Sequence, residues 1–107
     1  MKIEPFISYE IMIKINMRNL IVCIPRVNKN TTVQQVKDAF DLYKFGDISK
    51  ISIIPGKRDN KAFVKYNTLN LQQNTLEFCN VLEKKGEVKL FYNFPQFWKC
   101  YKSKQYI

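Results

Sequence analysis

The sequence predicts an α+β domain in which two helices cover one face of a four-stranded antiparallel sheet. Apolar residues recur at helical steps in two segments, and in four others they alternate with polar residues or run together as in strands. These segments follow one another as strand, helix, strand, strand, helix, strand. A chain of 107 residues, 46% of them hydrophobic, is close to the commonest domain size and can bury a core without disulfides or a metal.

Two apolar segments near the N-terminus have the character of strands. Isoleucines at alternate positions of residues 11–15 predict an additional strand within an N-terminal extension, residues 1–18. The apolar run at residues 20–24 predicts the first strand of the domain, and Pro25 limits its continuation. Because a four-stranded core has no place for the additional strand, it would pair with the sheet edge or cross the open face, and so form a homodimer or block binding.

The first helix is predicted to follow this strand. Thr31 or Thr32 is placed to cap its N-terminus, and Gly46 is placed to end it. Its apolar positions are Val33, Val36, Phe40 and Tyr43.

The next two strands form a predicted hairpin. Isoleucines at residues 48–54 predict one strand, and the turn-rich basic segment 55–60 predicts the loop. In the following strand, Lys61–Tyr66, successive side chains alternate between two faces. The core face would receive Ala62, Val64 and Tyr66. The opposite face would receive Lys61, Phe63 and Lys65, one ring between two cations.

A second helix and a last strand complete the predicted domain, residues 19–93. Thr68 or Asn70 would cap the helix, or Thr75 a shorter version, and Gly86 would end it. Its apolar face is Leu71, Thr75, Phe78 and Leu82. The last strand is predicted at residues 88–92, followed by a basic aromatic tail at residues 94–107.

This order of elements is that of the split βαβ, or ferredoxin-like, sandwich. With both helices on one face of the four-stranded sheet, the other face is left open for binding.

The net charge of +9 favours a polyanionic partner. Lysine is abundant, and because asparagine and isoleucine are also frequent, an A/T-rich genome would account for part of that charge. The composition therefore points to nucleic acid without deciding the matter.

Several function classes are not expected. With no histidine, no glycine-rich phosphate loop and no nucleophile beside a base, we predict no enzyme, no cofactor and no small-molecule substrate. The three cysteines are widely spaced, which predicts no metal site and fits a reducing, intracellular location. We find no apolar stretch long enough to predict membrane insertion.

Four ordered segments resemble the RNA recognition motif (RRM) family across residues 20–92. They are residues 22–27 at the hexapeptide motif, 31–40 at the first helix, 46–53 at the second strand and 59–66 at the octapeptide motif. At the family's three ring positions this chain has Cys23, Lys61 and Phe63, so a single ring remains. Residues 23–27, 61–64 and 92–99 are also loosely similar to RRM-like proteins of large DNA viruses, which would make this a viral protein.

The resemblance implies binding of single-stranded RNA, or of other single-stranded nucleic acid, by the open sheet face. Phe63 would stack a base, together with Phe91. Phosphates would be neutralised by Lys50, Lys61, Lys65 and Lys89, with Lys57 and Arg58 at the rim.

Two alternatives stay open. In the first, the chain is an RRM-like module for protein interaction or structure, and a homodimer is one form that this alternative allows. In the tail, Phe97, Trp98 and Tyr101 interleave with lysines, which suits either nucleic-acid contact or packing on the domain itself. We expect Trp98 to be at least partly buried.

Overall fold

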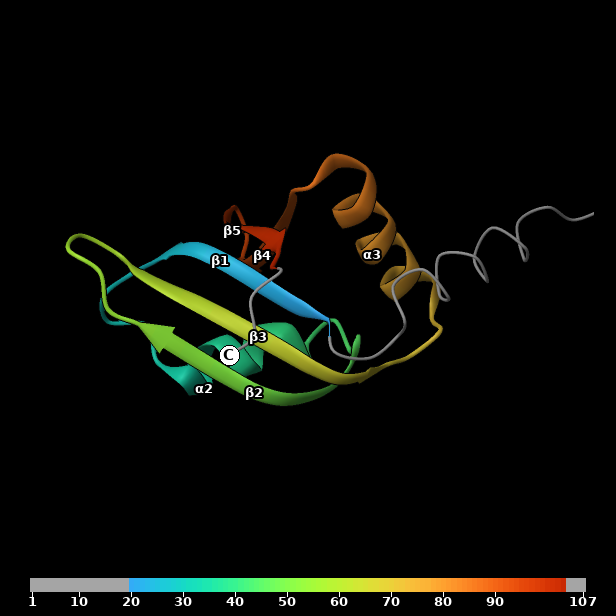
Figure 1. Cartoon of the computed structure of the whole chain (residues 1–107), viewed down its shortest axis with the longest axis horizontal. Helices are drawn as coiled ribbons and strands as arrows, with labels where there is room; N and C mark the ends of the chain where they lie inside the picture. The colour runs from blue at the N-terminus through green and yellow to red at the C-terminus, as the bar shows by residue number, and fades with distance from the viewer. Residues whose placement is uncertain (1–19, 104–107) are drawn as a thin grey trace, which may run out of the picture.

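The computed structural model describes residues 20–103, and these form a five-stranded sheet and two helices (Figure 1). The elements are β1 (Ile21–Val27), α2 (Val33–Asp41), β2 (Gly46–Ile54), β3 (Asn60–Leu69), α3 (Gln73–Lys85), β4 (Val88–Asn93) and β5 (Gln96–Lys102). The α+β class is as predicted. The additional strand expected at residues 11–15 lies outside the described residues.

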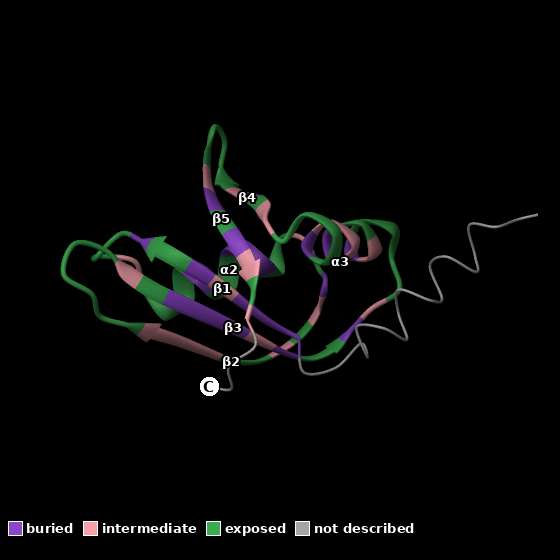
Figure 2. Cartoon of the chain, turned by 45° about the horizontal axis from the view of Figure 1, so that its top comes forward, coloured by how far each residue is buried: buried purple, intermediate pink, exposed green. Residues whose placement is uncertain are grey.

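The sheet has the order β2-β3-β1-β5-β4, and every neighbouring pair is antiparallel. The prediction of four strands is therefore wrong. The segment expected as the last strand forms β4, which lies at the edge of the sheet. The strand beside β1 is β5, which comes from the segment expected to be a tail. The hairpin of β4 and β5 stands out from the rest of the sheet (Figure 2).

One hydrophobic core lies between the sheet and both helices. Val22 on β1 pairs with Val64 on β3, which pairs with Ile51 on β2, and the three form a row on the core face. The predicted core residues of β3 are confirmed: Ala62, Val64 and Tyr66 all belong to this cluster. The helices supply Val36, Ala39 and Phe40 from α2, and Phe78, Cys79 and Leu82 from α3. Both helices thus cover the same face.

Strand β5 joins this core through its own alternation. Trp98 and Cys100 are buried with the core cluster, which confirms the expected burial of Trp98, while Phe97, Lys99 and Tyr101 lie on the other side of the strand. Lys102 returns to the helix side and pairs with Glu83 on α3. Cys79 of α3 and Trp98 and Cys100 of β5 therefore belong to the same core cluster.

Helix α2 begins with a capping box. The Gln35 backbone N–H donates to Thr32 Oγ1 (3.1 Å), and the Thr32 N–H donates to Gln35 Oε1 (2.9 Å). Thr32, rather than Thr31, is thus the cap. The helix ends at Asp41, earlier than predicted, and a turn follows it.

Gly46 has a different role from the predicted helix stop. It opens β2 beside Leu69 of β3. Its φ is +156°, and a Cβ there would come within 2.1 Å of the Thr68 carbonyl oxygen. Close approach of two strands requires glycine at this position.

Helix α3 begins after Gln72, which lies later in the chain than the predicted caps Thr68 and Asn70. Asn70 stands before the helix, where its Oδ1 accepts from the Gln72 N–H (3.1 Å) and from the Thr75 hydroxyl. Leu71 also precedes the helix and is exposed, so its predicted place on the apolar face is wrong. The predicted stop is confirmed, because Gly86 adopts the left-handed conformation with φ of 77°.

Two tyrosine hydroxyls give a direct test of this packing. Tyr66 is buried in the core and its hydroxyl has no hydrogen-bond partner within residues 20–103, while burial raises its pKa above the ordinary value. The Tyr43 hydroxyl, by contrast, donates to the Phe91 carbonyl oxygen at 2.6 Å.

We therefore expect Tyr66→Phe to raise the free energy of unfolding by about 1 kcal/mol, because it removes an unsatisfied buried hydroxyl. The matched change Tyr43→Phe should lower it by about 1 kcal/mol, because it removes a formed hydrogen bond. Urea unfolding of the two variants measures both effects. A loss of stability in Tyr66→Phe would show that its hydroxyl has a partner in solution.

Candidate nucleic-acid interface

Strand register defines the sheet face opposite the helices. Ser52 on β2 pairs with Phe63 on β3, Phe63 pairs with Cys23 on β1, and Cys23 pairs with Tyr101 on β5. Residues directly across from one another in a sheet share a face. The predicted outward residues of β3 therefore lie on one face with Tyr101, a residue of the predicted tail.

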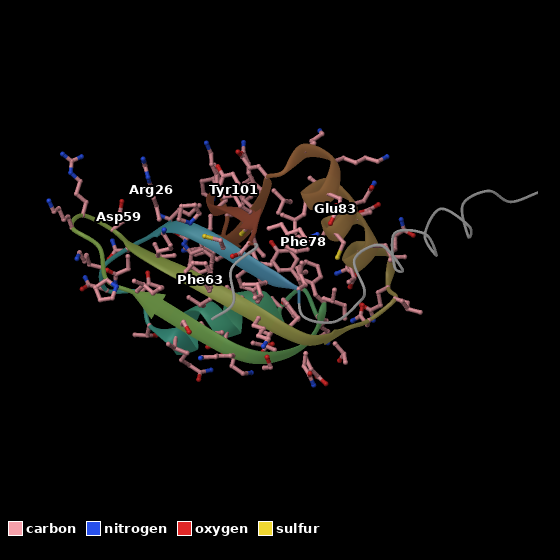
Figure 3. The ribbon with its side chains drawn as sticks, in the orientation of Figure 1. Arg26, Asp59, Phe63, Phe78, Glu83 and Tyr101 are labelled. Atoms are coloured by element: carbon pink, nitrogen blue, oxygen red, sulfur yellow. The ribbon has the colours of Figure 1, made fainter. Side chains whose placement is uncertain are left out.

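Phe63 does not offer a ring to solvent. It is 5% exposed, and its neighbour on this face, Ile21, is 4% exposed, yet neither belongs to the core cluster under the helices. Figure 3 shows Phe63 among other side chains near the middle of the sheet. The expected exposure of Phe63 is wrong, and the ring as it stands has no open surface on which a base would stack.

Lysines on this face are placed opposite one another. Lys50 on β2 pairs directly with Lys65 on β3, and Lys89 on β4 pairs directly with Lys99 on β5. Like charges directly across a strand pair destabilise a sheet. Both pairs therefore carry a repulsion that a bound anion would relieve.

No carboxylate of the described residues forms an ion pair with these four lysines. Within residues 20–103, the ion pairs are Lys37 with Asp41 on α2 and Lys102 with Glu83. Neither pair includes a lysine of the two cross-strand pairs. The ammonium groups of these four lysines are thus not neutralised by a carboxylate of residues 20–103.

Aromatic rings gather on the β4–β5 hairpin. Phe91 lies 5.3 Å from Phe97 and 5.4 Å from Phe94 between ring centroids. The ammonium group of Lys89 lies 4.8 Å from the centre of the Phe97 ring. Phe94, at the turn of the hairpin, is 81% exposed. The predicted residues Lys89 and Phe91 therefore stand on this hairpin, at the outer edge of the sheet.

Two neighbouring cavities combine rings with cations. The first, of about 500 Å³, is lined by Pro25, Arg26, Phe97, Trp98, Lys99 and Tyr101. The second, of about 430 Å³, is lined by Cys23, Pro25, Lys61, Phe63, Tyr101, Lys102 and Ser103. They share Pro25 and Tyr101, so they form a continuous basic and aromatic path along β1 and β5, which we call the β1–β5 path. Arg26 and Tyr101 are both marked in Figure 3.

Tyr101 is held in place at the centre of this path. Its hydroxyl donates to Glu87 Oε1 at 3.0 Å, and this hydrogen bond is the main cause of its raised pKa. Cys23 lies beside it, with a thiol pKa that burial raises and the charge of Lys61 lowers. Both groups are therefore uncharged near neutral pH, and the charged groups at the path are its lysines, Arg26 and the Glu87 carboxylate that holds Tyr101.

The loop between β2 and β3 lies at one end of the sheet. Lys57 and Arg58 are exposed in it, and Lys29 donates a hydrogen bond to the Gly56 carbonyl oxygen. The Gly56 N–H in turn donates to Asn60 Oδ1 at 3.2 Å. The two cations of the loop line neither cavity of the β1–β5 path. Their predicted position at the rim is compatible with this arrangement.

Sequence reasoning named the rings and lysines of this segment as candidates for nucleic-acid contact, but it placed them in a tail and not in a strand. Phe97, Lys99 and Tyr101 alternate with the buried Trp98 and Cys100, and this alternation is the signal of a strand. Arg26 was missed because it follows Pro25, where the first strand was expected to end. The structure extends β1 to Val27 and so brings Arg26 beside β5.

The chain matches no family model, curated protein or solved structure. Within residues 20–103, no three side chains of His, Cys, Asp or Glu come together as metal ligands would. No helix in this range has the length and apolar character needed to cross a membrane.

Proposed function

We propose that this protein binds single-stranded nucleic acid, RNA in the first place, across the β1–β5 path and the lysine pairs beside it. The observation that carries the proposal is the pairing of Lys50 with Lys65 and of Lys89 with Lys99. A sheet that keeps unbalanced lysines directly opposite one another gives up stability. A phosphate backbone would restore it by neutralising the facing ammonium groups, and the counterions that it releases would add to the affinity.

The proposed fold is ferredoxin-like, of the RRM type, with one additional strand. In support, the order β2-β3-β1-β5 with both helices on one face matches a split βαβ sandwich in which β5 is the last core strand. Strand β4 is then an addition at the edge. The free cysteines fit the reducing, intracellular location that we propose with it.

Base stacking in this proposal falls to Phe97 and Tyr101. Both rings are partly exposed and line the β1–β5 path, while Phe63 is buried. Arg26, Lys61 and Lys99 would contact phosphates along the same path. The ring expected from the octapeptide is thus replaced by rings from a strand farther along the chain.

Lys65→Glu tests the electrostatic part. The new carboxylate would face Lys50, so the free energy of unfolding should rise by up to about 1 kcal/mol. Binding of a single-stranded oligonucleotide should weaken, and the slope of log K against log salt should fall by about 0.7 for each phosphate that the variant no longer neutralises. Fluorescence anisotropy at several salt concentrations and urea unfolding measure the two effects.

Lys85→Glu is the matched control, because it changes net charge equally but lies in the last turn of α3. It should weaken oligonucleotide binding little, and it should lower stability because a lysine there favours the helix dipole. Equal weakening of binding in both variants would mean that net charge alone attracts the nucleic acid. Unchanged binding in Lys65→Glu would contradict the proposed interface.

Phe97→Leu tests stacking while keeping an apolar side chain in the hairpin. We expect binding to weaken by about 1–3 kcal/mol, the usual contribution of one stacked base. Phe94→Leu is the control, because Phe94 lines neither cavity of the path. If both variants bind like the unchanged protein, the rings of the hairpin do not stack on bases.

The exposed ring of Phe94 favours a second candidate, a protein-interaction module. A phenyl ring that is 81% exposed at a hairpin turn, beside Phe91, is an apolar contact for a partner such as a second copy of the chain. For a homodimer held there, Phe94→Ser should give a monomer in analytical ultracentrifugation while leaving oligonucleotide binding intact. A chain that sediments as a monomer without the substitution rules this dimer out.

A further inference from the structure

A third cavity, of about 560 Å³, lies outside the basic face, between α2, the β1–α2 loop and the β4–β5 hairpin. It is lined by Asn28, Asn30, Thr31, Gln35, Asp38, Ala39, Leu42, Tyr92, Asn93 and Trp98. Its size is within the range of small-ligand sites. We call it the amide cavity, because four of its lining residues carry side-chain amides.

The charge of the amide cavity is opposite to that of the β1–β5 path. Among the described residues, no lysine or arginine lines it, and its one charged lining residue is Asp38. A phosphate would find no cation in this lining and would meet a carboxylate. An uncharged ligand that donates hydrogen bonds to the Asp38 carboxylate fits the site better.

The aromatic wall of the amide cavity ends a stack of rings that begins in the core. Phe40 and Trp98 are nearly parallel, 18° apart with centroids at 6.5 Å, and Tyr92 stacks on Trp98 at 4.2 Å and 24°. Tyr92, at 37% exposure, is the ring at the surface end. A planar ligand laid on Tyr92 would add one more layer to this stack.

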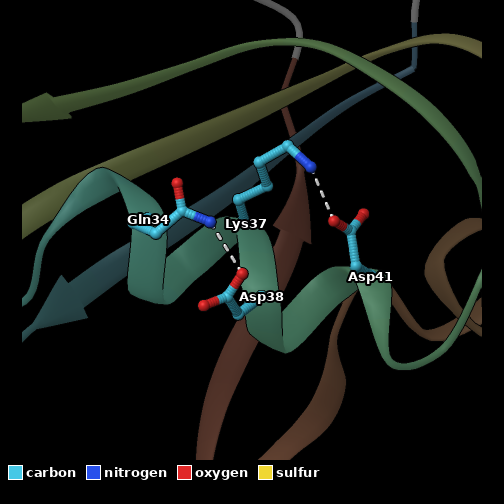
Figure 4. A network of polar contacts seen from close by, with 4 residues as sticks. All are labelled: Gln34, Lys37, Asp38 and Asp41. Carbon is cyan, nitrogen blue, oxygen red and sulfur yellow. Dashed lines mark hydrogen bonds and ion pairs between the residues drawn. The ribbon is translucent and has the colours of Figure 1, made fainter.

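The polar side of the amide cavity carries side-chain groups that are available for hydrogen bonds with a ligand. Within the described residues, the side-chain amides of Asn30 and Asn93 make no hydrogen bond, and Asn28 uses its Oδ1 to accept from the Asn30 N–H at 2.8 Å. Asp38 Oδ1 accepts from Gln34 Nε2 at 2.8 Å, which leaves its second carboxylate oxygen without a hydrogen bond in residues 20–103 (Figure 4). Donors and acceptors are thus both available beside the rings.

The amide cavity and the β1–β5 path meet at one residue, because Trp98 lines both. We propose that it holds one nucleobase of the strand whose phosphates lie along that path, an inference that rests on the proposed function. The base stacks on Tyr92, and its exocyclic amino group donates to Asp38. Cytosine, which carries such a group, is therefore favoured over uracil, which carries a carbonyl at the same position.

Cytidine and uridine are the probes, because they differ at that position and carry no phosphate. Trp98 is the one tryptophan of the chain and lines the cavity, so its fluorescence reports occupancy. We expect cytidine to quench it saturably, with about tenfold or greater preference over uridine. Because the described lining holds no cation, this binding should change little with salt, unlike oligonucleotide binding.

Asp38→Asn should remove the preference for cytidine. The control is Glu77→Gln on α3, where the carboxylate accepts from Gln73 four residues earlier at 3.2 Å, as Asp38 does from Gln34. Both hydrogen bonds are exposed, and circular dichroism checks that both variants fold. Glu77→Gln should keep the preference unchanged.

The outcomes separate the two proposals. If an oligonucleotide binds but neither nucleoside changes the fluorescence, or if cytidine and uridine bind equally, the base-reading role of the cavity is overturned and the proposed function stands. If cytidine binds with the expected preference but no oligonucleotide binds, the cavity is supported as a site for the free nucleoside only, and the proposed function fails. A preference for cytidine that survives Asp38→Asn overturns the role given to that carboxylate.

Discussion

The alternation of side chains along the central strands is the constraint on which the rest of this molecule depends. On β3, Ala62, Val64 and Tyr66 fill the core under both helices, and this fixes the register of β3 against its neighbours. A slip of one residue would send every one of these side chains to the other face. The lysines between them are therefore held on the opposite face by the core, and their positions follow from packing rather than from their own interactions.

The same constraint explains why lysines face one another. With β3 fixed by its core residues, Lys65 has to stand opposite Lys50, and on the hairpin Leu90 opposite Trp98 likewise puts Lys89 opposite Lys99. A glutamate in place of one lysine of each pair would turn the repulsion into an attraction. Two such pairs cost a fraction of the free energy of folding, and the proposed anionic partner would offset that cost.

Features that local sequence patterns determine, such as the end of α3 and the core positions of β3, were predicted from the sequence. Features that depend on where a segment lies in the sheet, such as the burial of Phe63 and the pairing of β5, were not. The core residues of β3 and the Gly86 helix stop follow from periodicity and backbone conformation, and these predictions are confirmed. Of the two predicted caps of the first helix, Thr31 and Thr32, the structure uses Thr32. The burial of Phe63 was not predictable from alternation, because alternation gives the face of a residue and not what covers that face. Strand β5 was predicted as a tail because its rings and lysines suit nucleic-acid contact, although Trp98 and Cys100 alternate with them as in any half-buried strand.

The proposed interface divides affinity from discrimination in space. Phosphates are the same in every sequence, so Arg26 and Lys99 on the β1–β5 path would attract any strand equally. A reading of base identity needs donors and acceptors that face the base, and the amide cavity would supply them around Tyr92. Trp98 lies between the two environments and contacts the core through Phe40. Because Trp98 is buried with the core cluster, we infer that the phosphate path and the base cavity keep their positions relative to each other.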